Sequence, residues 1–262
     1  MEDTSKGFVR NSMILLITST IAAGIHYLFQ FGMGRLLGPA DYCLLAAFFS
    51  ILYIMQAPVQ AVQLTITKFV AEFKAKNNLS VIKDLLIRST KKIFLISLVV
   101  FAVFAVFSRQ IAQFLNISQH ILIIYFSFIF IGMFILPCTR GFLQGMQKFK
   151  ALGINLILES AIKLISGLTL VFFGFGVAGA VWGTIISIIL AFALGFLLLL
   201  KLMKKYNITK IEHVKKLEIY AYSIPMLVAL LSITALYSVD VILVRHFFPA
   251  TDAGIYAAAS LI

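Results

Sequence analysis

Long apolar segments alternate with short polar ones along the whole of this chain. Most of the apolar segments reach the roughly 20 residues that a helix needs to cross about 30 Å of hydrocarbon. They are Ser12–Leu37, Leu44–Thr67, Ile93–Phe107 or Ile93–Leu115, Ile121–Cys138, Leu152–Phe175, Gly176–Leu200 and Ile219–Phe248. An eighth begins near Ala253 and reaches Ile262, where the sequence stops. The pattern predicts an all-α, polytopic integral membrane protein with seven complete spans and the start of another.

Composition supports this class. The chain is 61% hydrophobic and only 12% charged, outside the range of soluble globular domains. The first apolar segment is too long for the apolar region of a secretory signal, and no Ala-x-Ala site follows it, so we expect an uncleaved span. Cys43 and Cys138 fall in or beside apolar segments without a Cys-x-x-Cys or His pairing. This arrangement argues against a zinc site.

The basic residues are distributed unevenly over the polar segments. Eighteen of the twenty-two Lys and Arg residues lie in the N-terminus and in alternate connections, which are Lys68–Lys92, Arg140–Lys150 and Lys201–Lys216. The positive-inside rule therefore predicts a cytoplasmic N-terminus in the plasma membrane. Anionic lipid headgroups account for the net charge of +12. Nucleic-acid binding is not expected, because no basic domain with interleaved aromatic residues is present.

One of the basic connections has a helical apolar pattern of its own. Within Asn77–Lys92, an apolar side is formed by Leu79, Ile82, Leu85 and Leu86. This pattern predicts a short cytoplasmic amphipathic helix that serves as a connector at the membrane interface.

A polar turn near the start of the chain is partly repeated 210 residues later. Arg35-Leu-Leu-Gly-Pro-Ala-Asp-Tyr42 matches Arg245-His-Phe-Phe-Pro-Ala-Thr-Asp252 in its Arg, Pro and Ala, with the Asp displaced by one position. An internal repeat at this distance predicts two like halves. Because six spans separate the turns, the repeats would be parallel and would meet at a central cleft. We expect a six-helix lobe over residues 1–205, and a connector and truncated second lobe over residues 206–262.

Polar side chains inside the predicted spans are the candidate functional residues, because polar groups in hydrocarbon normally face protein or a water-filled cavity. At 100° per residue they form stripes on single helix faces. The stripes are Ser12, Ser19, His26 and Gln30 on span one, Gln56, Gln60, Gln63 and Thr67 on span two, Asn155, Glu159, Lys163, Ser166 and Thr169 on span five, and Ser223, Thr234, Tyr237 and Ser238 on span seven, with Asp240 off to one side of the last stripe. The alternative interpretation is that Ser, Thr and Gln hold helices together.

Among these residues, Glu159 and Lys163 are the most specific candidates for a functional pair. They lie four residues apart with the Glu on the N-terminal side, the spacing that allows an ion pair along one helix. Either the two charges only neutralise each other so that the span can insert, or they line a cavity in which Lys163 holds an anionic substrate or Glu159 exchanges a coupling cation. His26 could titrate near neutral pH, or it could be a packing residue.

Several motifs resemble those of one family. Arg35–Tyr42 after a first span resembles the polysaccharide-biosynthesis flippases of the multidrug/oligosaccharidyl-lipid/polysaccharide exporter superfamily. Arg140–Gln147 and the Asn155-x-x-x-Glu159-x-x-x-Lys163 pattern are similar to the sporulation-protein-like and lipid II flippase branches. Val239-Asp240 followed by Arg245 and Gly254-x-Tyr256 resembles the seventh-span signature. The positions in the motif turns are Arg35, Gly38, Pro39, Asp41, Arg140, Gln144, Gly145, Arg245 and Gly254.

The resemblance implies a transporter rather than an enzyme. It implies two six-helix lobes with a cavity lined by spans one, two, seven and eight, alternating access, and a substrate of the polyprenyl-pyrophosphate-linked glycan type. It also implies contact with membrane lipids, a coupling cation (H+ or Na+), and a glycan polymerase or glycosyltransferases as pathway partners. The candidate cavity residues are Lys163, Glu159, His26, Gln30, Gln56, Gln60, Gln63 and Asp240. Neither a cofactor nor a metal is expected, and a chain of this length alone is not expected to transport.

Two alternatives stay open. A multidrug/cation antiporter of the same superfamily would favour acidic and aromatic cavity residues over basic ones. A membrane-embedded glycan transferase or ligase would need a catalytic carboxylate or an Arg cluster in an outer loop, and the outer loops here are short and poor in charge. The sequence contains no nucleotide loop, no His-Glu-x-x-His motif and no Ser/His/Asp set, so covalent chemistry is not expected.

Overall fold

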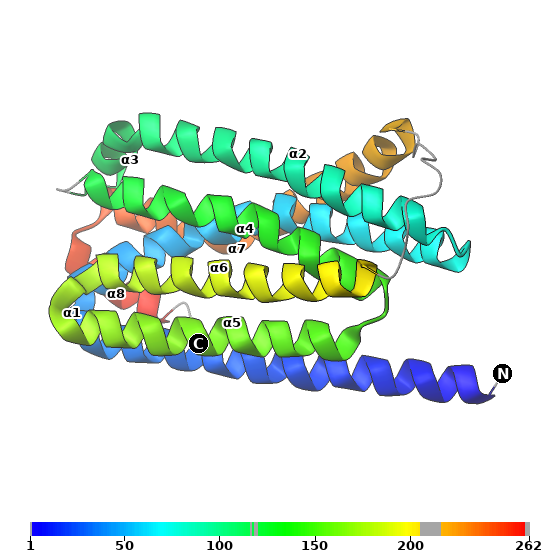
Figure 1. The fold of residues 1–262 in the computed structure, drawn as a ribbon. Helices are drawn as coiled ribbons and strands as arrows, with labels where there is room; N and C mark the ends of the chain where they lie inside the picture. The colour runs from blue at the N-terminus through cyan, green and yellow to red at the C-terminus, as the bar shows by residue number, and fades with distance from the viewer. Residues whose placement is uncertain (1, 116, 118–119, 205–215, 260–262) are drawn as a thin grey trace.

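The computed structural model describes residues 2–115, 117, 120–204 and 216–259, and all the regular structure in these ranges is helical (Figure 1). The elements are α1 (Glu2–Ala75), α2 (Leu79–Val106), α3 (Ser108–Phe114), α4 (Ile121–Gly145), α5 (Phe149–Leu170), the turn η1 (Val171–Phe175), α6 (Gly176–Met203), α7 (Lys216–Phe247) and α8 (Ala250–Ala259). The prediction of an all-α protein with long apolar helices is confirmed. Residues 205–215 of the predicted connector lie outside the described residues.

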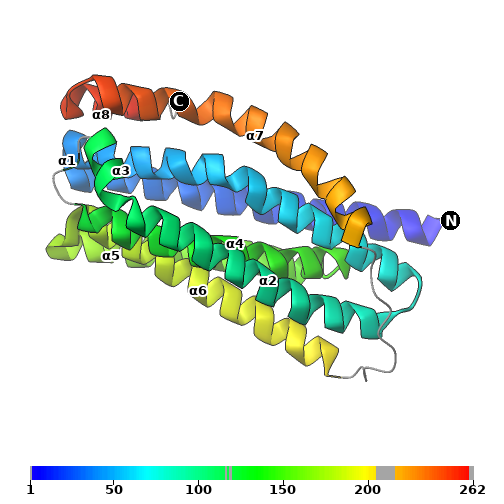
Figure 2. The ribbon, with the colours of Figure 1, turned by 90° about the horizontal axis from the view of Figure 1, so that it is seen from above.

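Two of the long helical stretches are hairpins. Gly38 has a φ of 74° and is followed by Pro39, and a positive φ is a conformation that glycine adopts at little cost. The backbone therefore reverses inside α1, which consists of a first arm (residues 2–37) and a second arm (residues 39–75). The same reversal occurs between α5 and α6, where Gly174 has a φ of 87° and Gly176 a φ of 52°. Residues 2–203 thus form six long antiparallel segments (Figure 2).

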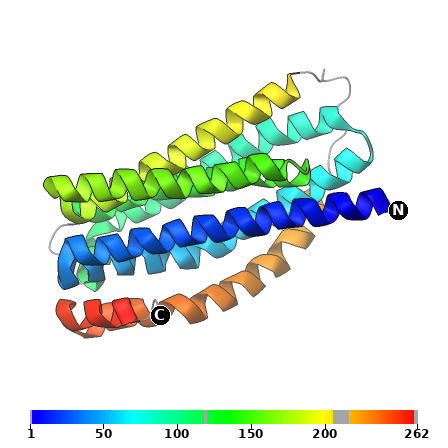
Figure 3. The same cartoon turned by 90° about the horizontal axis from the view of Figure 1, so that it is seen from below.

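The turns gather at two opposite ends of the bundle. The N-terminus, the α1–α2 turn, the α4–α5 turn and the end of α6 lie at one end, which we call the basic end (right in Figure 1). The Gly38 turn, α3, the α5–α6 turn and the α7–α8 turn lie at the opposite end (Figure 3). The described parts of the segments that are rich in Lys and Arg therefore share one side of the molecule, as a cytoplasmic face requires.

The separate amphipathic helix predicted for Asn77–Lys92 is wrong. Its residues form the first half of α2, which continues without a break from Leu79 to Val106. Ile82 is completely buried and Leu86 is 1% exposed, so this half packs on the bundle instead of lying at the interface. Twenty-eight residues make a helix of about 42 Å, longer than the hydrocarbon layer, and the basic half extends beyond it.

Glycines allow close approach between neighbouring helices. A Cβ atom at Gly141 would lie 2.8 Å from the carbonyl oxygen of Gln63, and one at Gly145 would lie 2.9 Å from that of Thr67. This Gly-x-x-x-Gly spacing presses α4 against the second arm of α1, in the manner of small-residue contacts between membrane helices. These two helices form the wall on which the candidate site is built.

The end of α7 is attached to the N-terminal bundle at the end opposite the basic end. Arg245 is 6% exposed and lies against the Cys43 side chain just beyond the first repeated turn. The His246 ring stacks on Phe114 of α3 with 4.3 Å between ring centroids, and its Nδ1 lies 2.7 Å from the Phe114 carbonyl oxygen. The two repeated turns thus lie at the same end of the molecule (Figure 1), as parallel repeats require. The division at residue 205 stays a prediction.

Candidate binding site in the N-terminal bundle

A polar network joins α4, α5 and α6. Arg140 donates from Nε to the Asn155 Oδ1 atom at 3.0 Å and forms an ion pair with the Glu159 carboxylate at 2.5 Å. Asn155 in turn donates from Nδ2 to the backbone carbonyl of Ala191 at 2.7 Å. Arg140 and Glu159 are 13% and 21% exposed at their side chains. One guanidinium therefore satisfies polar groups on two positions of α5, and Asn155 continues the connection to α6.

This network corrects the ion pair that the sequence predicted. Glu159 is paired with Arg140, and within the described ranges no salt bridge connects Glu159 to Lys163. The predicted pair failed because Arg140 was assigned to a cytoplasmic connection that starts where span four ends at Cys138. In the structure α4 continues to Gly145, so Arg140 lies on a helix that faces α5.

Lys163 is left as a buried cation in an aromatic setting. Lys163 is only 6% exposed. Its Nζ atom lies 4.7 Å from the centroid of the Phe29 ring and 4.4 Å from that of the Phe49 ring. An ammonium over ring faces is stabilised by the ring quadrupoles. In the part of the chain that the structure describes, no carboxylate forms a salt bridge with it. A charge at membrane depth is costly without a partner, which makes this position a candidate functional residue.

Lys163 faces a small cavity inside the bundle. The cavity has a volume of about 110 Å³ and is lined by both arms of α1 and by α4, α5 and α6. Its polar lining residues are His26, Tyr53, Gln56, Glu159, Lys163 and Thr184, and its apolar ones are Phe49, Leu52, Ile129, Met133 and Ile188. The Nδ1 atom of His26 is buried and has no hydrogen-bond partner among the described residues. A liquid water occupies about 30 Å³, so the cavity has room for a phosphate-sized group.

Four of the eight predicted cavity residues line this cavity together. They are His26, Gln56, Glu159 and Lys163. The resemblance implied a cavity formed by spans one, two, seven and eight, whereas this one lies within the N-terminal bundle. No described residue of α7 or α8 lines it.

The other four predicted residues lie elsewhere. Gln63 donates from Nε2 to the Gln144 Oε1 atom at 3.1 Å, so it holds the second arm to α4 and the helix-contact interpretation is correct for it. Gln30 lies beside Tyr53, and Gln60 is exposed. Asp240 is exposed on α7 and accepts a hydrogen bond from the Tyr256 hydroxyl at 2.9 Å.

The motif turns have structural positions away from the cavity. Gly38 makes the reversal in α1, with Pro39 and Asp41 exposed beside it. Arg35 is also exposed, and its guanidinium lies 4.5 Å from the Phe31 ring centroid. Gln144 and Gly145 lie in the contact between α4 and the second arm. Arg245 is buried near the end of α7, and Gly254 lies in α8.

Sequence reasoning missed the apolar lining residues, two polar lining residues and the rings over Lys163. Tyr53 and Thr184 line the cavity, and Phe29 and Phe49 cover the Lys163 ammonium. Tyr53 could have been found, because it lies three residues before Gln56 on the same helical stripe. The two phenylalanines carry no comparable signal among the 25 in the chain.

Comparison with known proteins places this chain in a family. The family described as polysaccharide biosynthesis protein matches residues 8–262. An uncharacterized membrane protein of Methanocaldococcus jannaschii is 26% identical over 276 residues, which cover 97% of this chain and 62% of that protein. The chain therefore spans less than two thirds of the curated relative that it matches.

Solved transporters of one superfamily have the same fold. A MOP superfamily transporter from Pyrococcus furiosus, described by the reverse polarity of its binding pocket, superposes with a TM-score of 0.69 at 14% identity, over 95% of this chain and 62% of that one. An inward-facing multidrug resistance MATE family transporter of the MOP superfamily gives 0.72 at 15% identity, over 94% and 60%. At these identities the likeness establishes the fold, while the family match covers nearly every residue. The chain belongs to the polysaccharide biosynthesis protein family.

Proposed function

We propose that this chain acts in a membrane flippase that moves a lipid-linked oligosaccharide or polysaccharide precursor across the plasma membrane by alternating access. The observation that carries the proposal is the Lys163 ammonium, which is buried, faces a cavity and forms no salt bridge with a carboxylate in the described ranges. The family match and the solved transporters support transport rather than an enzymatic reaction.

The sign of the charge in the cavity favours an anionic substrate. The Glu159 carboxylate is neutralised by Arg140, so the positive charge of Lys163 determines the electrostatic potential in the cavity. A cation in a low-dielectric site attracts the pyrophosphate of a polyprenyl-linked precursor strongly. The volume of about 110 Å³ has room for a phosphate group, so Lys163 would contact the phosphate and the saccharide would extend outside this cavity.

A multidrug/cation antiporter is the second candidate, because a solved neighbour is a multidrug resistance transporter. A drug cation would be repelled by Lys163, which weakens this candidate. The P. furiosus transporter, whose binding pocket is described as reversed in polarity, is also described as having a different function. A cationic cavity here is compatible with a function other than the export of drug cations.

Coupling to H+ or Na+ belongs to the same proposal. Glu159 was the predicted exchange group, but its ion pair with Arg140 leaves it a structural role. His26 lines the cavity, and its buried Nδ1 atom, which has no hydrogen-bond partner among the described residues, is a site where a proton can bind. We therefore infer that His26 is the coupling residue if the coupling ion is H+. Association with a glycan polymerase or glycosyltransferases follows from the pathway and stays a proposal.

Lys163→Met tests the proposed substrate contact. The variant should accumulate in membranes as the wild type does, because the Arg140–Glu159 pair is kept and a charge that costs roughly 3 kcal/mol on insertion scales is removed. Binding of a polyprenyl pyrophosphate to the purified protein should weaken about 10- to 100-fold. This is the range expected for the loss of one hydrogen bond to a charged group. Native mass spectrometry measures the binding. Flipping in proteoliposomes should fall in parallel.

Lys150→Met is the matched control, since Lys150 is exposed at the basic end and its loss should leave both measurements unchanged. Lys163→Arg keeps the charge and should retain more binding than Lys163→Met. A well-folded Lys163→Met variant that binds and flips normally would remove Lys163 from the site.

The orientation in the membrane is testable with introduced cysteines. The charge distribution predicts a cytoplasmic basic end, so a cysteine at the exposed Pro39 should react with an impermeant maleimide in intact cells, and a cysteine at the exposed Lys76 should react only after permeabilisation. Background labelling should be low because Cys43 and Cys138 are buried. The opposite labelling pattern would invert the topology.

A further inference from the structure

A second cavity lies at the basic end, on the outside of the bundle between α2 and α6. It has a volume of about 400 Å³. Both helices pack on α4 but contact each other little, so a groove stays open where the start of α2 lies next to the end of α6 (Figure 2). The lining residues are Lys83, Leu86 and Ile87 from α2 and Leu200, Lys201, Met203 and Lys204 from α6. The proposed transport site shares none of them.

The lining separates charge from apolar surface. Three lysines form the polar part, and none of the seven lining residues is acidic. Leu86 and Met203 form an apolar floor, each 1% exposed. A groove with a cationic rim and an apolar floor complements a molecule with an anionic head and an apolar tail.

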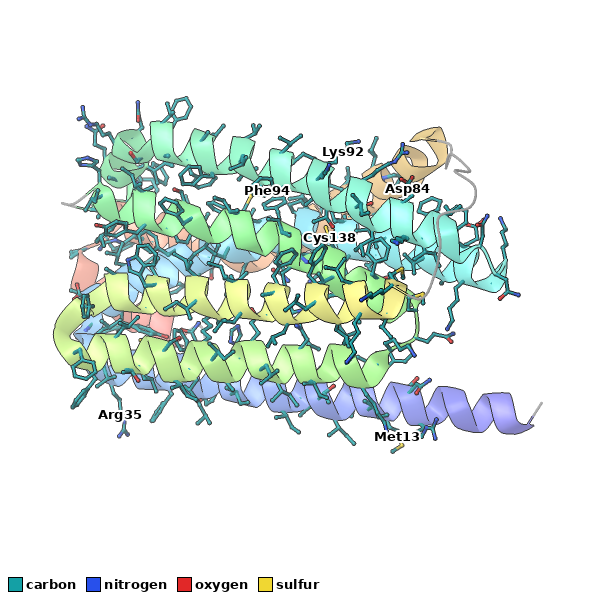
Figure 4. The ribbon with its side chains drawn as sticks, viewed as in Figure 1. Met13, Arg35, Asp84, Lys92, Phe94 and Cys138 are labelled. Carbon is teal, nitrogen blue, oxygen red and sulfur yellow. The ribbon has the colours of Figure 1, made fainter. Side chains whose placement is uncertain are left out.

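Apolar surface continues from the groove toward the middle of the bundle. On α2, Ile87, Phe94 and Leu98 are all partly exposed and lie on one face at spacings of seven and four residues. Figure 4 marks Asp84, Lys92 and Phe94 along α2, in that order from the basic end. On α6, Leu200 and Leu197 are exposed at 41% and 62%. A hydrocarbon chain that leaves the groove would therefore run along apolar side chains on both sides.

We propose that this groove binds an anionic diacyl phospholipid of the cytoplasmic leaflet, with its phosphate among Lys83, Lys201 and Lys204 and an acyl chain along α2 and α6. The basic end carries the charge distribution of a cytoplasmic face, where anionic headgroups are concentrated and basic pockets between helices bind them. The bound lipid bridges α2 to α6, which contact each other little directly. A soluble anion would gain nothing from the apolar floor, which is why we commit to a lipid.

Lipid binding to the purified protein tests this proposal. Native mass spectrometry would compare phosphatidylglycerol with phosphatidylcholine, and the wild type should retain phosphatidylglycerol selectively. Each lysine near a membrane surface strengthens binding about fivefold, so the triple variant Lys83→Gln/Lys201→Gln/Lys204→Gln should bind phosphatidylglycerol about 100-fold more weakly. The control triple Lys91→Gln/Lys92→Gln/Lys150→Gln removes the same charge from exposed positions outside the groove. It should change binding less than twofold.

A second variant tests the apolar part while keeping the lysines. Ile87→Asn/Leu200→Asn places polar groups at two partly exposed lining positions, and phosphatidylglycerol binding should weaken at least tenfold. This double variant decides the question if the groove lysine triple cannot be purified.

Three results would overturn the lipid site. Equal losses in the groove triple and the control triple would indicate attraction by general charge only. Equal retention of phosphatidylcholine and phosphatidylglycerol would show that the lysines do not select a headgroup. Displacement of the lipid by glycerol 3-phosphate at the same concentration would identify a site for soluble anions.

Discussion

Glu159→Leu is expected to destabilise the N-terminal bundle by about 3–5 kcal/mol, the range for removing one partner of a buried ion pair. The variant leaves the guanidinium of Arg140, which is 13% exposed, without its carboxylate. It also removes the nearest negative charge from the buried Lys163, one turn further along α5. Two cations would then share a low-dielectric region without this carboxylate to neutralise them, and desolvation would oppose folding.

A double-mutant cycle separates the structural pair from the pair that the sequence predicted. Arg140→Met should be milder than Glu159→Leu, because the remaining carboxylate still has Lys163 one turn away. Arg140→Met/Glu159→Leu should recover most of the loss, since no buried charge of that pair remains. Thermal unfolding in detergent, followed by the fluorescence of the single tryptophan Trp182, measures all four proteins. If Lys163→Met rescued Glu159→Leu better than Arg140→Met does, the result would support the Glu159–Lys163 ion pair that the sequence predicted.

The helices were predictable because hydrocarbon imposes a length and a composition on every span. The same reasoning failed where helices continue past the hydrocarbon. The start of α2 and the last turns of α4 contain Lys, Arg and Gln, and the pattern assigned them to connections. A helical backbone satisfies its own hydrogen bonds at the interface as well as in lipid, so a change to polar residues does not end a helix.

The candidate site was predictable in part for a related reason. Periodicity along one helix identified the faces of His26, Gln56, Glu159 and Lys163, and these four line one cavity. Periodicity contains no information on which face of one helix meets which face of another. The Arg140–Glu159 pair, the Gln63–Gln144 hydrogen bond and the rings over Lys163 all depend on such meetings. The contacts between helices therefore could not be predicted from the periodicity of single helices.

Close contact between α5 and α6 is one of these packing features, and it supports the cavity directly. Ser166 donates to the carbonyl oxygen of Gly183 at 3.2 Å, and Thr184, the next residue, lines the cavity. Gly167 lies four residues after Lys163 on α5 and faces Gly183. The separation of the two backbones at this point therefore sets the distance between the Lys163 and Thr184 walls.

Gly183→Val should destabilise the protein by about 3 kcal/mol, at the upper end of the usual range for overpacking. A Cβ atom at this position would lie 2.5 Å from the Cα atom and 2.6 Å from the amide nitrogen of Gly167. Backbone atoms cannot rotate out of the way as a side chain does, so α5 and α6 would have to separate. Gly24→Ala is the control, since a Cβ atom there meets no atom within 4 Å and alanine favours a helix by about 0.5–1 kcal/mol over glycine. The midpoint of thermal unfolding should fall for Gly183→Val and stay level or rise for Gly24→Ala, and equal midpoints would exclude direct backbone contact between the two helices.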